Sequence, residues 1–170
     1  MNKNKRYAYI TILCSLAIVI NLIENLFIPP IAFGIRFGLA NIVSLVALKT
    51  LGTKEMSLVV LLRLTLGNLI KGTIFGTPFW ISSLGIIFSS IVILLLDKLN
   101  ASISFTSMMS SVAHTFGQLI VVCIIYNQIN VMAILPLLIV SSLATGTFTG
   151  IITNKVLKRI NIKRGNKQTI

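Results

Sequence analysis

Several charged, amide and imidazole side chains lie in or beside apolar segments of this 170-residue chain. A charged side chain inside a bilayer costs at least about 2.5 kcal/mol, so such residues are candidates for ligand binding or transport. Arginine can hold an anionic group, and asparagine or glutamine can orient a ligand through hydrogen bonds. We therefore predict a ligand-binding site formed by Glu24, Arg36, Asn41, Arg63, His114 and Gln118.

Spacing indicates which polar residues share a helix face. His114 and Gln118 are four positions apart, so they lie on one face of their helix. Asn21, Glu24 and Asn25 share a face in the same way. The sequence thus predicts two short polar faces on otherwise apolar helices.

Structural interpretations of these residues stay open beside the functional one. Glu24 can pair with Arg63 or Arg36 and lock helices together, and His114 can hydrogen-bond a neighbouring helix. Arg36 and Lys71 can extend to the membrane interface. If the polar residues form a cavity, its basic groups outnumber Glu24, which favours a small, partly anionic ligand.

Small residues mark places where helices can approach closely. Gly117 lies between His114 and Gln118 and permits the approach of a ligand or another helix. Ser142, Gly146 and Gly150 recur every four residues and predict a packing face. Whether that face meets this chain or another subunit stays open.

Composition indicates the elements that position these residues. Apolar residues make up 55% of the chain and charged residues only 11%, whereas soluble domains carry about a quarter charged residues. We therefore predict an all-α membrane bundle of six transmembrane helices. The predicted helices are Tyr7–Ile28, Phe37–Leu51, Met56–Lys71, Phe79–Leu96, Phe105–Tyr126 and Val131–Leu157, with turns at 52–55 and 127–130. The second and third are shorter than the roughly 20 residues that a span needs.

Charge predicts the topology. With the N-terminus inside, 12 of the 15 Lys and Arg residues fall in cytoplasmic segments, and only Arg36 and Lys71 in outer loops. This bias follows the positive-inside rule, so we expect a multi-pass cell-membrane protein with both termini cytoplasmic. We assign residues 1–157 to the six-helix domain and 158–170 to a polar, disordered, basic tail. Most of the costly polar residues then lie in the outer half of the bilayer.

Several functions lack the residues that they require. The basic residues flank apolar runs instead of interleaving with aromatic residues, which argues against nucleic-acid binding. The chain has no Gly-rich phosphate loop, no metal-ligand spacing and only three acidic residues. Cys14 and Cys123 both lie in apolar runs and are typical of small buried hydrophobic residues. We therefore predict a chain that is not an enzyme and binds no metal or cofactor.

Three stretches carry a family resemblance. The segment Arg36-Phe37-Gly38-Leu39-Ala40-Asn41 resembles the R-[LF]-G-L-A-N signature of the Gx transporter family, also labelled heptaprenyl diphosphate synthase component I. Leu62-Arg63, followed by Gly67 and Gly72, also agrees, and 113–119 is similar to the family's A-H-N-x-G-Q-L. The resemblance covers about residues 10–155.

Two positions depart from the family pattern. Thr115 stands where the family usually has asparagine, and Gly85-Ile86 stands where it has paired glycines. The first departure bears on the polar site. The second bears on helix packing.

The family is similar to the six-helix substrate-binding subunits of energy-coupling-factor transporters. The resemblance implies a membrane subunit that binds a vitamin- or cofactor-like solute and works with a transmembrane coupling subunit and an ATPase pair. The alternative is a noncatalytic membrane accessory subunit for heptaprenyl diphosphate or menaquinone synthesis, or for flavin-based extracellular electron transfer, with a prenyl synthase or flavoprotein partner. In both cases the chain contacts membrane lipid and binds no nucleic acid.

Overall fold

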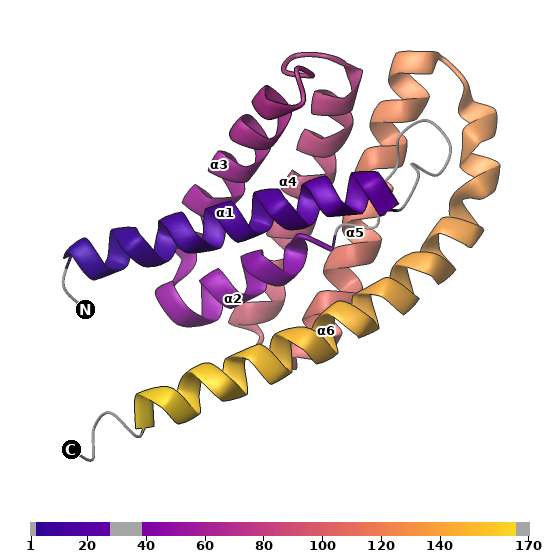
Figure 1. Cartoon of the computed structure of the whole chain (residues 1–170). Coiled ribbons are helices and arrows are strands. Elements are labelled where there is room, and N and C mark those ends of the chain that lie inside the picture. Colours follow the sequence, from indigo (N-terminus) through magenta and orange to yellow (C-terminus); the bar gives the residue numbers. More distant parts are fainter. Residues whose placement is uncertain (1–2, 28–38, 166–170) are drawn as a thin grey trace.

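The computed structural model describes residues 3–27 and 39–165, and all regular elements within these ranges are helices (Figure 1). This confirms the all-α prediction. The elements are α1 (Lys3–Phe27), α2 (Asn41–Leu51), α3 (Thr53–Ile70), α4 (Thr77–Lys98), α5 (Ile103–Tyr126), the 3-10 helix η2 (Ile129–Ile134) and α6 (Leu135–Gly165).

Four helical segments are long and apolar enough to cross a membrane: α1, α4, α5, and η2 together with α6. Their surfaces carry large exposed apolar side chains, such as Ile87, Ile91 and Leu95 one turn apart on α4. A lipid environment removes the cost of exposing these side chains to water. The chain is therefore a multi-pass membrane protein.

Helices α2 and α3 differ from these four. Helix α2 has 11 residues, which span about 16 Å, whereas the hydrocarbon core is about 30 Å thick. It begins at Asn41 and not at Phe37 as predicted, because Leu39 and Ala40 form a turn; positions 37 and 38 lie outside the described residues. Helix α3 has 18 residues but includes Lys54, Glu55 and Arg63. The count of six spans stays a prediction for these two helices.

A single residue, Gly52, connects α2 to α3. Its φ of +110° is strained for residues with a side chain, and its N–H donates to the carbonyl oxygens of Ala47 and Leu48. The predicted four-residue turn is therefore wrong, because α3 already begins at Thr53. The two helices form a tight hairpin.

Helix α6 is longer than predicted. It continues past Leu157 to Gly165, so the expected disorder is wrong over 158–165. Lysine and arginine are good helix formers, so a basic composition does not end a helix. At its other end, η2 covers the second half of the predicted polar turn and the first residues of the predicted sixth helix, so α6 begins only at Leu135.

Ion pairs link helix ends that the sequence predicted to be cytoplasmic. Arg6 of α1 pairs with Glu55 of α3, and Lys49 of α2 pairs with Asp97 of α4. The start of α1 and the end of α6 lie on the same side of the molecule (Figure 1). The contacts agree with the predicted grouping of ends, while the orientation in the membrane stays a prediction.

Helices α4, α5 and α6 pack through glycines. A Cβ added at Gly117 would lie 2.8 Å from the carbonyl oxygen of Leu84 on α4, and one added at Gly146 would lie 2.7 Å from Cα of Met108 on α5. Gly150 also faces α5, so the small-residue stripe of α6 packs within this chain. Gly117 likewise faces another helix, α4.

Hydroxyl and amide groups add links between α5 and α6. The Ser107 and Thr149 hydroxyls lie 2.7 Å apart, and Asn154 donates to the Ser104 hydroxyl over 2.9 Å.

The described part of the bundle has two apolar cores. One apolar core lies among α1, α2, α3 and the adjacent part of α4, and another lies among α4, α5, η2 and α6. The candidate site is built from both groups of helices.

Candidate functional site

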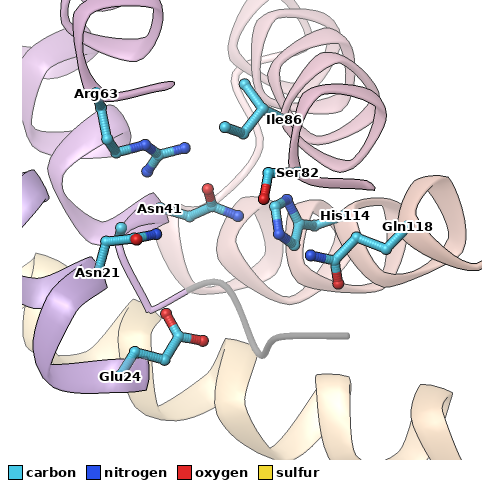
Figure 2. A pocket seen from close by; sticks show the side chains of 9 residues that line it. Asn21, Glu24, Asn41, Arg63, Ser82, Ile86, His114 and Gln118 are labelled. Atoms are coloured by element: carbon cyan, nitrogen blue, oxygen red, sulfur yellow. The ribbon is translucent and has the colours of Figure 1, made fainter. Parts of the chain in front are cut away.

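A polar cavity lies where the first five helices meet (Figure 2). Its volume is about 20 Å³, enough for roughly one water molecule. The residues that line it are Asn21 and Glu24 of α1, Ala40 and Asn41 at the start of α2, Arg63 of α3, Ser82 and Ile86 of α4, and His114 and Gln118 of α5. Polar side chains from distant parts of the sequence thus meet inside an apolar bundle.

Helix α1 brings two side chains to the cavity on one face. Asn21 and Glu24 are three positions apart, and Glu24 is only 3% exposed. Lys71, immediately after α3, donates a hydrogen bond to the side-chain oxygen of Asn21. This bond ties α1 to the end of α3 near the cavity.

Arg63 supplies a buried positive charge. It is 5% exposed, and its Nε and Nη1 atoms have no hydrogen-bond partner within the described part of the chain. Glu24 acts on it electrostatically. Leaving a buried donor unsatisfied costs about 1–3 kcal/mol, and more for a charged group, so an acceptor placed beside this guanidinium would stabilise it.

Asn41, the first residue of α2, supplies a second donor. It is 2% exposed, and its Nδ2 has no hydrogen-bond partner among the residues described. The N-terminal end of a helix carries a partial positive charge. Asn41 and the start of α2 therefore add to the positive character that Arg63 gives this part of the cavity.

Helices α4 and α5 form a closely packed wall of the cavity. A Cβ added at Gly85 would lie 2.7 Å from Cγ of Gln118 and 3.0 Å from Cε1 of His114, so glycine at this position leaves space for both side chains. Ser82 lies one turn before Gly85 and also lines the cavity. This wall offers a hydroxyl, an imidazole and an amide, each able to donate or accept a hydrogen bond.

Five of the six predicted site residues lie on this cavity: Glu24, Asn41, Arg63, His114 and Gln118. Arg36 lies outside the described residues, as does the side chain of Asn25. The spacing argument is confirmed to the extent that His114 and Gln118 face the same space. Their role in ligand binding stays a prediction.

Two lining residues, Ser82 and Ile86, were not among the predicted site residues. Serine is inexpensive in an apolar helix because it can bond to its own backbone, so Ser82 gives little signal in a sequence. Ser82 lies one turn before Gly85, on the same face of α4, and this spacing is the sequence feature that could have indicated its place in the site.

The central part of the chain matches a known protein family. The sequence profile of the family described as heptaprenyl diphosphate synthase component I matches residues 13–156. The chain belongs to this family. No curated protein and no solved structure gives a match.

In this member of the heptaprenyl diphosphate synthase component I family, the three stretches that carry the resemblance converge. Asn41 ends the first stretch, Arg63 belongs to the second, and His114 and Gln118 belong to the third; all four line the cavity. The agreement with the family thus includes the polar residues that the fold brings together.

The two departures from the family pattern, Thr115 and Ile86, differ in whether they line the cavity. The Thr115 hydroxyl lies 2.6 Å from the Ser142 hydroxyl of α6, so this residue joins helices and does not line the cavity. Ile86 does line the cavity and packs into the core formed with α1–α3. A glycine there would leave more space for a ligand.

The three acidic residues of the family member lie in separate places. Glu55 pairs with Arg6, Asp97 pairs with Lys49, and Glu24 lines the cavity. The described residues include no group of three or more metal-binding side chains. They therefore offer no clustered carboxylates of the kind that hold magnesium against a diphosphate.

Proposed function

We propose that this chain is the small-molecule binding subunit of an energy-coupling-factor-type membrane transporter. It lies in the cell membrane with both termini cytoplasmic and binds a small, partly anionic, vitamin- or cofactor-like solute. One observation carries the proposal: Arg63 places unsatisfied donors in a buried polar cavity that Asn41, His114 and Gln118 also line. Buried unpaired polar groups of this kind are typical of ligand sites.

The chain needs partners to transport a solute. It lacks a phosphate-binding loop of the Walker type, so the energy of ATP must come from other subunits. The resemblance to energy-coupling-factor systems supplies the expected set: a transmembrane coupling subunit and an ATPase pair.

The family description favours a second function. A component I implies a second synthase component, so a noncatalytic membrane accessory subunit for heptaprenyl diphosphate or menaquinone synthesis is the alternative. In this function the apolar bundle would hold a soluble prenyl synthase at the membrane. A flavoprotein partner in extracellular electron transfer is a variant of the same role.

Co-purification separates these functions. The tagged chain is extracted from its native membrane in mild detergent, and its partners are identified by mass spectrometry. Recovery of an ATPase pair and a coupling subunit supports transport, whereas recovery of a soluble prenyl synthase or a flavoprotein supports the accessory role and contradicts the transporter.

The binding function is tested on the chain itself. Native mass spectrometry of the wild type should show a retained small molecule, and Arg63→Ala should lose it. The matched variant Arg159→Ala, which removes an exposed arginine from α6, should retain the molecule. Equal retention or uptake of every candidate ligand by Arg63→Ala would overturn the binding site.

A further inference from the structure

We infer that the ligand of this cavity is a small monocarboxylic acid that carries a further hydrogen-bonding group. Its carboxylate would be held by Arg63 and Asn41 beside the start of α2. The inference rests on the proposed binding function and names the chemical class of its ligand.

The unsatisfied donors in the cavity favour an anionic ligand. Nε and Nη1 of Arg63 and Nδ2 of Asn41 are N–H donors on side chains at least nine-tenths buried, and none has a partner among the described residues. A carboxylate has two oxygens that accept several hydrogen bonds and match the planar guanidinium. The partial positive charge at the start of α2 favours an anion at the same place.

The charges of the cavity limit the charge of its ligand. Among the described residues that line it, Arg63 and Glu24 carry opposite charges, and Glu24 acts on Arg63 electrostatically. Because Glu24 already offsets part of the Arg63 charge, a monocarboxylate adds only one negative charge to the cavity, whereas a diphosphate would bring two or more close to Glu24. Magnesium normally offsets such charge, and the carboxylates needed to hold it are paired elsewhere, Glu55 with Arg6 and Asp97 with Lys49.

The side of the cavity away from Arg63 limits the rest of the ligand. Figure 2 shows Arg63 on the opposite side of the view from Gln118, with His114 and Ser82 near Gln118. The side chains of His114, Ser82 and Gln118 can donate or accept hydrogen bonds, in a wall where Gly85 and Gly117 allow close packing. A ligand that reaches them from Arg63 needs a hydroxyl, carbonyl or amide group beyond its carboxylate.

The volume of the cavity limits the size of the ligand. The cavity of about 20 Å³ is smaller than any such acid, so the surrounding helices must separate slightly to admit it. A compact ligand requires the smallest separation. This consideration favours short hydroxy-, keto- and amido-acids.

The test uses the purified full chain in detergent and follows its unfolding temperature with a panel of sodium salts at constant ionic strength. The monocarboxylates are lactate, pyruvate, 3-hydroxybutyrate and N-acetylglycine; succinate and inorganic pyrophosphate are the competing anions. We expect at least one monocarboxylate to raise the unfolding temperature by about 5 °C near saturation, and pyrophosphate to give no rise. The inference is overturned if no monocarboxylate acts or if succinate or pyrophosphate gives the largest rise.

Two variants locate the effect. Arg63→Gln removes the guanidinium, and Asn41→Asp replaces a donor by a negative charge at nearly constant shape, so each should abolish the rise. Arg159→Gln, an exposed arginine on α6, should keep the full rise. Gel filtration shows whether each variant is folded, and a rise that persists in either folded site variant overturns the inference.

Failure of this inference can be distinguished from failure of the proposed function. A carboxylate response together with a prenyl synthase partner would keep the ligand class and remove the transporter. A coupling subunit and ATPase pair, together with a retained phosphorylated molecule, would keep the transporter and remove the carboxylate.

Discussion

Helices α4–α6 and helices α1–α3 contact their neighbours in different ways. In α4–α6, glycines bring backbones together, as at Gly117 against Leu84 and Gly146 against Met108, and hydroxyl pairs such as Ser107–Thr149 link the helices. In α1–α3, apolar side chains form the core, whereas Gly67 of α3 has no atom within 4 Å of an added Cβ.

The two regions also carry different polar groups. The α1–α3 region holds Glu24 and Arg63, both buried, while the α4–α5 wall holds His114 and Gln118. The cavity thus has one wall on helices in close backbone contact and a charged wall on helices that meet through apolar side chains. The carboxylate of the proposed ligand would lie against the charged wall.

The largest expected effect comes from filling a glycine contact. Gly117→Ala places a Cβ 2.8 Å from a backbone oxygen of α4 and should lower the free energy of unfolding by about 1–3 kcal/mol. Gly67→Ala, in open space on α3, should be neutral or raise it by up to about 1 kcal/mol through helix propensity. Thermal unfolding in detergent measures both. Equal losses at the two glycines would show that α3 is packed as closely at Gly67 as α5 is at Gly117.

The next effect comes from the charged wall. Glu24→Gln and Arg63→Met should each cost about 1–2 kcal/mol, because each removes a charge that acts on the other buried polar group. The double variant should cost less than the sum, with a coupling energy of about 1 kcal/mol. A double-mutant cycle from unfolding measurements gives this energy. Additive costs would show that the two charges stabilise the fold independently.

A smaller effect comes from a hydroxyl pair between α5 and α6. Ser107→Ala combined with Thr149→Val removes both partners, and we expect a loss of about 0.6 kcal/mol, the average for such bonds in membrane proteins. Ser57→Ala is the control, because this exposed serine bonds only to the Thr53 carbonyl of its own helix. A larger loss in the control would place the important hydroxyls on α3 instead.

The smallest effect comes from an ion pair at the predicted cytoplasmic end. Glu55→Gln breaks the pair with the half-exposed Arg6 and should cost about 0.5 kcal/mol at low salt. Glu55 is buried, but the cost should still fall as salt is added, because ions screen the charge of the half-exposed Arg6. Lys54→Gln, an exposed neighbour, should show neither the cost nor the salt dependence. A salt-independent loss would indicate a packing role for Glu55.

Much of the site could be predicted because polar residues in a membrane are costly. Glu24, Asn41, Arg63, His114 and Gln118 interrupt apolar runs, and the fold brings all five to one cavity. Placing a polar group in contact with lipid raises the free energy of the protein, and contact between polar groups inside the bundle reduces this cost. The same cost therefore explains why the five side chains lie together.

Other features could not be predicted from the sequence. Ser82 gives no signal in an apolar helix, since one serine costs little there. The start of α2 at Asn41 depends on a turn at Leu39 and Ala40, two residues that also suit a helix. The extension of α6 to Gly165 depends on basic residues that suit both a helix and a disordered tail.

The one-residue connection at Gly52 has a consequence for biosynthesis. Helix α2 is too short to be inserted as an independent span, and α3, as a predicted span, would carry Arg63 into the bilayer at a cost. Because only Gly52 separates the two helices, we expect them to insert together as one hairpin. The apolar residues of α2 would then offset part of the insertion cost of Arg63, so a longer linker at Gly52 should reduce the yield of membrane-integrated chain.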